Sequence, residues 1–170
     1  TADGNGIKLG PKKYNSKHLI FEPAKEEPFA INDNQQYRGS LEIIVNPDGK
    51  TMMVINRVAL EKYIAGVVAS EMPSYWELEA LKAQAIAART YVMFIKNKFG
   101  KNRPWDVKAT QANQVYKGLR AETMRTNEAV EATSGMVLCT PETGEVFPTY
   151  YSAVCAGHTE NSENVFGDSY

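Results

Sequence analysis

The stretch GVVASEMPSYWELEALKAQAIAARTY, residues 66–91, decides the fold. The apolar residues that lead into it recur at helical spacing over about two turns, and Pro73 then ends the pattern. They are Leu60, Tyr63, Ile64, Val67 and Val68. This spacing predicts a short amphipathic helix. Ser74, followed three residues later by Glu77, is typical of a capping box, so we expect a second helix to start there.

The second helix is predicted to be long and central. Its apolar residues recur at spacings of four and three until Gly100, which we expect to end the helix. They are Leu81, Ala85, Ala88, Val92, Ile95 and Phe99. Several alanines between residues 80 and 88 have small side chains that let other backbone elements approach closely. The helix should therefore lie in the middle of the fold.

Short strands are predicted before these helices. Residues 1–35 are rich in Lys, Asn, Gly and Pro and contain one strand candidate, residues 18–21, so we expect an arm that lies on the domain. Residues 41–45 and 52–56 also have strand character. Pro47, Asp48 and Gly49 lie between them and suit a tight turn, which predicts a β-hairpin.

After the long helix, residues 121–134 favour another helix that Gly135 ends. Residues 136–139 and 146–152 then indicate two strands, separated by a turn at residues 141–144. The predicted fold class is therefore α+β, a mixed single domain with a long central Ala-rich helix packed against short antiparallel strands.

Length and charge limit the functional classes. The chain has 170 residues, which suits one domain after the arm of residues 1–35, and we expect more residues to follow Tyr170 in the full protein. The 19 basic and 20 acidic residues give a net charge of -1, so nucleic-acid binding is not expected. No apolar run approaches the roughly 20 residues that span a bilayer.

The chain has two cysteines, Cys139 and Cys155, which are too few for a disulfide framework. A single bridge in an oxidising compartment stays open. Cys139 ends an apolar strand candidate, where a free cysteine usually behaves as a small buried hydrophobe.

Glu71 lies between the two predicted helices, where rigid elements on both sides would hold its carboxyl group. Its apolar neighbours favour the protonated form of such a group, which suits a general acid. They are Val67, Val68, Met72 and Trp76. A glutamate at a helix end is more often simply solvated, and composition alone leaves both interpretations open.

Polar residues flank the apolar stripe of the long helix. Gln84 and Tyr91 lie to one side of it and Arg89 to the other. Arg89 is expected to pair with a nearby carboxylate and Gln84 to be a hydrogen-bonded core amide, because a buried guanidinium must find acceptors. Direct participation of these residues in a site is the alternative.

These segments closely resemble the stage II sporulation protein D family, the SpoIID/LytB domain. The resemblance is carried by residues 66–73, Trp76 and residues 79–85 and 87–91, and it continues in order at both sides. The outer matches are Tyr37, Arg38, Gly39, Asn56, Leu60, Glu61, Lys62, Tyr63, Asp106, Gln114, Tyr116, Gly118, Tyr151, Ser152, Cys155, Gly157, His158, Thr159 and Glu160.

The resemblance implies a lytic transglycosylase, a lyase that cleaves the glycan backbone of peptidoglycan between MurNAc and GlcNAc. Glu71, the glutamate before Met-Pro, would be its catalytic acid and base. Such an enzyme is exported and acts outside the cytoplasm in the cell envelope, in sporulation or in other wall turnover. A membrane anchor in a removed N-terminal segment is one possibility, and a cell-wall amidase or envelope protein is a possible partner.

Residues 151–160 match the family loop that contains Gly-Gly-x-Thr-Glu, except that Ala156 replaces the first Gly. By resemblance, Tyr151, Ser152, Gly157, His158 and Thr159 are candidates to bind the glycan, and Ser152 and Thr159 could alternatively brace Glu71. We expect this loop to lie across a cleft from Glu71.

A required cofactor is not expected, but zinc is one alternative that the resemblance raises. Cys155 and His158 have a Cys-x-x-His spacing that could supply two ligands. Cys139, His18 or residues after Tyr170 would have to complete the site. A Cys155–His158 nucleophile pair is a further alternative, although no orienting third residue is evident. A non-catalytic glycan-binding module or amidase enhancer is the alternative function for the whole domain.

Overall fold

The computed structural model describes residues 1–2, 6–25, 27–31, 35–152 and 154–167. The chain divides into two compact units, Thr1–Ala59 and Leu60–Tyr170. Helices and short antiparallel sheets are both present, which confirms the α+β class.

The first unit is built around a three-stranded antiparallel sheet in the order β3-β6-β7. The strands are β3 (His18–Phe21), β6 (Ser40–Val45) and β7 (Met52–Arg57). The predicted hairpin is therefore confirmed. In the turn of this hairpin, the Asp48 carboxylate accepts hydrogen bonds from the backbone N–H groups of Lys50 and Thr51, and Gly49 has a φ of 66°.

The strand predicted within the N-terminal arm is also confirmed, since β3 pairs with β6 along its whole length. Two further pairs of strands complete the unit. They are β1 (Ile7–Leu9) with β2 (Lys12–Tyr14), and β4 (Phe29–Ile31) with β5 (Gln35–Tyr37). Ile7, Ile43 and Val45 form the buried core.

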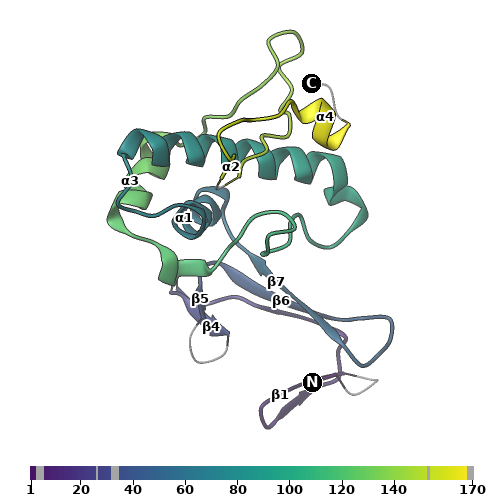
Figure 1. Cartoon of the computed structure of the whole chain (residues 1–170). Helices are drawn as coiled ribbons and strands as arrows, with labels where there is room; N and C mark the ends of the chain where they lie inside the picture. Colours follow the sequence, from purple (N-terminus) through teal and green to yellow (C-terminus); the bar gives the residue numbers. More distant parts are fainter. Residues whose placement is uncertain (3–5, 26, 32–34, 153, 168–170) are drawn as a thin grey trace. The chain divides into compact units, whose positions relative to one another are not determined.

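The second unit is mainly helical (Figure 1). Its elements are α1 (Leu60–Glu71), α2 (Leu78–Phe99), η1 (Gly100–Asn102), η2 (Gly118–Ala121), α3 (Met124–Ala132) and α4 (Ser162–Phe166). The 22-residue helix α2 packs against both α1 and α3. Ala85 and Ala88 are fully buried in it, which agrees with the predicted central position.

The ends of α2 differ from the prediction. Ser74 does not form the expected capping box, because residues 73–76 form a turn in which Trp76 N–H donates to Pro73 O, and α2 begins only at Leu78. The helix ends at Phe99 as predicted. Gly100 has right-handed helical angles, however, and the chain continues directly into η1.

The helix predicted at residues 121–134 is confirmed as α3, although it is shorter. A capping box of Thr123 and Thr126 starts it. After the helix, Gly135 has a φ of 75°, a conformation that glycine adopts more readily than other residues.

The two strands predicted at residues 136–139 and 146–152 are wrong: only the single bridge Cys139–Val146 joins the segments. Their polar groups bond to α2 instead. Leu138 N–H donates to Thr90 Oγ1 at 2.9 Å, and Thr149 Oγ1 donates to Ala87 O at 2.7 Å. The segment therefore lies on the long helix rather than forming a sheet.

Within the described part of the chain, no helix combines the length and the apolar character that crossing a membrane requires.

Candidate functional site

Glu71 is the last residue of α1 and is partly buried. Its Oε1 accepts a hydrogen bond of 2.7 Å from the backbone N–H of Val115, a residue 44 positions later in the chain. A helix C-terminus carries partial negative charge and disfavours a nearby anion. The Val115 N–H supplies partial positive charge and fixes the carboxyl group at this position.

The same loop holds the preceding residue. Ser70 Oγ donates to Gly66 O at 2.6 Å and accepts from Lys117 N–H at 3.3 Å. The end of α1 is thus tied to residues 115–117 by two contacts. Gly66 permits the close approach, because a Cβ on it would lie 2.6 Å from the Tyr116 ring.

The residue before Val115, Gln114, has a buried side-chain amide. Gln114 is fully buried, its Nε2 donates to Ala88 O at 3.0 Å and its Oε1 accepts from the Tyr63 hydroxyl at 3.1 Å. These two bonds fix the orientation of the amide. The Tyr63 and Tyr116 rings pack together with centroids 4.9 Å apart.

Tyr151 brings the C-terminal loop to Glu71. Burial raises the pKa of Tyr151, and the negative charge of Glu71 raises it further, so the phenol keeps its proton near neutral pH. Its hydroxyl is buried without a well-formed hydrogen bond to any described residue, although Gln114 and Glu71 lie close enough to influence its proton. Burial likewise raises the pKa of Tyr63. The charge of Glu71 therefore acts on two phenols that keep their protons, those of Tyr151 and Tyr63.

Arg89 does not contribute to this group of residues. It is fully buried and makes two hydrogen bonds to the Glu61 carboxylate, of 2.9 Å to Oε1 and 2.7 Å to Oε2, and one of 2.9 Å to Met136 O. Burial would raise the pKa of Glu61, but the bonds from Arg89 and Gly135 N–H outweigh it and hold that pKa below its usual value. Arg89 is the partner of a carboxylate, as the sequence favoured.

Tyr91 and Gln84, the other two polar residues of α2 that the sequence analysis singled out, have surroundings different from those of Arg89. The Tyr91 ring lies 6.2 Å from that of Tyr150, and its hydroxyl is among the groups that influence Tyr151. Gln84 was expected to be a hydrogen-bonded core amide. Its Nε2 is buried, yet no described residue accepts a hydrogen bond from it.

The described remainder of the family-like loop, residues 152 and 154–160, is exposed. Ser152 Oγ donates to Val154 O at 3.4 Å, and His158 N–H donates to Cys155 O at 3.1 Å. Gly157, His158 and Thr159 are exposed to solvent. The structure thus brings Tyr151 to Glu71, while binding of the glycan by the other loop residues stays a prediction.

The thiols do not form a bridge. Cys139 and Cys155 are both free and exposed, so the prediction that Cys139 is a buried hydrophobe is wrong. Within the described residues, no three His, Cys, Asp or Glu side chains are grouped as metal ligands would be. His18 is hydrogen-bonded to Glu42 at 2.6 Å. Among the residues that the structure describes, no further side chains join Cys155 and His158 as zinc ligands, and zinc binding stays a prediction.

Comparison with known sequences identifies the family of the chain. A profile of the SpoIID family, described as Stage II sporulation protein, matches residues 48–139, more than half of the chain. The chain belongs to the SpoIID family.

Relatives of this SpoIID chain include an uncharacterized protein of Brachyspira hyodysenteriae, 39% identical over 162 residues that cover 95% of this chain and 42% of the relative. The amidase enhancer of Bacillus subtilis is 34% identical over 98% of this chain and 21% of its own length. Stage II sporulation protein D of the same organism is 37% identical over 64% of this chain and 35% of its own. The chain spans less than half the length of these relatives.

Sequence reasoning placed Glu71 at the helix junction but missed its surroundings. Gln114 and Tyr116 were recognised only as matches to the family, and Tyr63 as such a match and as an apolar position of α1. Val115 was not singled out, because it acts through its backbone N–H. No side-chain pattern in the sequence carries that signal.

Proposed function

We propose that this SpoIID chain is a lytic transglycosylase that cleaves peptidoglycan glycan strands between MurNAc and GlcNAc and leaves 1,6-anhydro-MurNAc ends. The observation that carries the proposal is the position of Glu71, whose carboxyl group is held by Val115 N–H beside the protonated Tyr151. Family membership supports the same assignment.

One carboxyl group suffices for this reaction. Protonated Glu71 donates its proton to the bridging oxygen, the C1–O bond breaks, and positive charge develops on the MurNAc ring as an oxocarbenium-like state. The 6-hydroxyl of the same sugar then attacks C1, and the Glu71 carboxylate takes the hydroxyl proton. No water enters, and Glu71 returns to its starting state.

The neighbours of Glu71 suit a single-carboxyl mechanism. The groups with the largest influence on the pKa of Tyr151 include one carboxylate, Glu71, together with Gln114 and Tyr91, whereas a glycoside hydrolase usually uses two carboxylates. In the proposed reaction, the Tyr151 hydroxyl donates to the carboxylate after proton transfer. Val115 N–H keeps the carboxyl group in place throughout.

The test is mass spectrometry of peptidoglycan digested by the unmodified protein and by Glu71→Gln. We expect anhydro ends from the first and a loss of at least about 100-fold in the second, because a positioned acid and base typically contributes 10²–10⁴ in rate. Glu77→Gln, a change at an exposed position, is the matched control and should stay active. Anhydro ends released equally by Glu71→Gln would refute the assignment.

A second candidate function is enhancement of a cell-wall amidase without cleavage of glycan. The relative named amidase enhancer favours it, since its similarity covers 98% of this chain. It predicts that the protein sediments with purified wall and stimulates an amidase, that Glu71→Gln does both equally well, and that neither releases anhydro products. Both candidates place the protein outside the cytoplasm, at the cell wall.

A further inference from the structure

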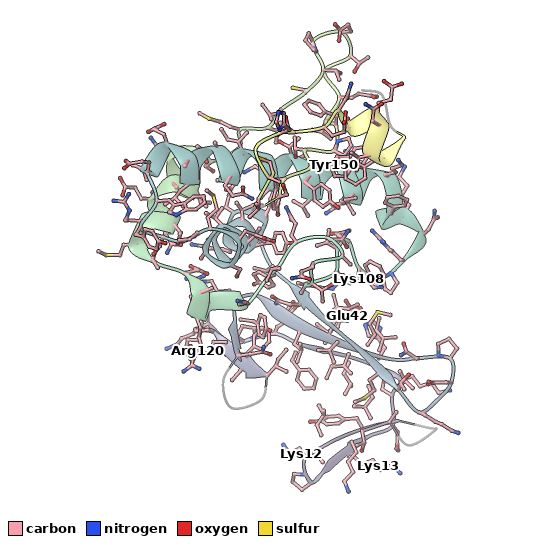
Figure 2. All side chains as sticks on the ribbon, in the orientation of Figure 1. Lys12, Lys13, Glu42, Lys108, Arg120 and Tyr150 are labelled. Carbon is pink, nitrogen blue, oxygen red and sulfur yellow. The ribbon has the colours of Figure 1, made fainter. Side chains whose placement is uncertain are left out.

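An aromatic stack lies next to the candidate site. The rings of Tyr150 and Phe166 have centroids 3.9 Å apart and planes inclined by 21°, while Tyr91 packs against Tyr150 at 6.2 Å and 59°. Tyr150 is therefore in contact with rings from both α2 and α4. Figure 2 shows Tyr150 on the segment that runs along α2 near α4.

Phe166 is the outer ring of this stack. It is 52% exposed and Tyr150 is 40% exposed. Tyr150 stacks on one face of Phe166, and about half of the Phe166 residue is still exposed to solvent. Helix α4 fixes the ring: the Asn161 side chain accepts a hydrogen bond from Glu163 N–H, and Gly167 ends the helix with a φ of 72°. Grouped exposed aromatic rings in an ordered position are typical of a binding surface.

The stack is continuous with the surroundings of Glu71. Tyr150 immediately precedes Tyr151, whose hydroxyl feels the charge of Glu71, and Cα atoms of adjacent residues are only about 3.8 Å apart. Tyr91 touches Tyr150 and also influences Tyr151. A polymer bound at Glu71 has to continue over the neighbouring surface, and the stack provides exposed aromatic rings on one part of that surface.

We propose that Phe166, backed by Tyr150, is a stacking platform for one pyranose ring of the glycan strand, at a position that flanks the bond held at Glu71. The polymer identity rests on the proposed function. The C–H groups on the apolar face of a sugar carry partial positive charge and are attracted to the negative face of an aromatic ring. Glu160 and Asn164, which are hydrogen-bonded to each other at 2.7 Å, provide polar groups near the sugar hydroxyls.

Binding without turnover tests the platform. Titration calorimetry would measure the affinity of the Glu71→Gln protein for the hexamer of N-acetylglucosamine, with further changes at Phe166. Phe166→Leu keeps an apolar side chain but removes the aromatic face, and we expect a loss of about 5-fold in affinity. Phe166→Trp should keep the affinity, and its indole emission should change when the hexamer binds.

Val165→Ala is the matched control, because Val165 is an exposed apolar residue of the same helix and is 57% exposed. Its affinity should stay unchanged. Equal affinities of Phe166 and Phe166→Leu proteins, or an equal loss in Val165→Ala, would overturn the platform. If Phe166→Leu unfolds, the indole emission of Phe166→Trp tests the platform instead. An emission that stays the same at saturating hexamer would overturn the proposal.

The two proposals fail separately. If Phe166→Leu weakens binding while the unmodified protein releases no anhydro ends, the platform stands and the cleavage proposal fails. If anhydro ends depend on Glu71 but the hexamer binds equally well to Phe166→Leu, only the platform fails.

Discussion

Ala156 has a φ of 51°, a left-handed backbone conformation in which its Cβ is crowded. The loop of the SpoIID family that residues 151–160 resemble has glycine at this position. Glycine adopts this conformation without that steric cost. It also has more conformational entropy than alanine when the turn is unfolded, which offsets part of the gain in stability.

We therefore expect Ala156→Gly to stabilise the folded turn at residues 155–158 by about 0.5–1 kcal/mol. The measurement is hydrogen exchange of the His158 N–H, which donates to Cys155 O within this turn. Protection should rise about 2- to 5-fold in Ala156→Gly and fall in Ala156→Val, whose branched side chain fits the conformation worse. Identical exchange in all three proteins would contradict this account.

Single residues also show how far the sequence could predict the site. Glu71 was identified because it lies between two helices in a family-like motif, and Arg89 because a buried guanidinium needs an acceptor. The contacts of Glu71 with Val115 and of Tyr63 with Gln114 join positions 44 and 51 residues apart. Such pairs depend on the tertiary fold, and no local spacing encodes them.

At the scale of elements, Arg89 joins three segments: α2, the Glu61 carboxylate on α1 and the Met136 carbonyl after α3. Arg89→Met would leave the Glu61 charge partly buried without its partner. Breaking such a pair typically costs 3–5 kcal/mol, and because the Glu61 side chain is 35% exposed we expect about 3 kcal/mol.

Urea unfolding followed by tryptophan fluorescence would measure this loss, since Trp76 and Trp105 both belong to the second unit. The matched control is the double variant Arg89→Met with Glu61→Leu, which removes both charges and should recover part of the stability. A single variant as stable as the unmodified protein would show that the ion pair does not hold these elements together.

The elements that sequence predicted well are those whose signals are local. The apolar stripes of α1 and α2 repeat every three or four residues, and the turn at Pro47 to Gly49 spans three residues. The segments at 136–139 and 146–152 also had apolar character, but their backbone and side-chain groups bond to Thr90 and Ala87 of α2. A strand needs a partner strand, and the sequence of one segment does not say which surface will satisfy its polar groups.

At the scale of the whole molecule, each unit contains an ion pair with one buried partner, Glu42 in the first unit and Arg89 in the second. Glu42 of the first unit is labelled in Figure 2. Its side chain is only 3% exposed, and it is hydrogen-bonded to His18 and Arg57, whose side chains are 52% and 58% exposed. The hydrogen bond from Arg57 holds the pKa of Glu42 below its usual value despite burial.

This lowered pKa gives the first unit a pH dependence. Stability from Glu42 is fully present above the pKa of an unfolded glutamate, about 4.3, and is lost as pH falls through the lower folded-state pKa. In urea unfolding followed by NMR resonances of β6, Glu42→Gln should be less stable than the unmodified protein at neutral pH. The difference should shrink in acid. A difference that does not depend on pH would refute this assignment.

The contact between Glu71 and Val115 has a practical consequence for mutagenesis. Its donor is a main-chain amide, which replacement of valine by alanine, leucine or threonine leaves in place. Alanine scanning would therefore score position 115 as unimportant, and a map of the site drawn from truncated side chains would omit the group that anchors the Glu71 carboxyl group. Only chemistry that alters the peptide bond itself, such as an ester linkage or proline at 115, removes that donor.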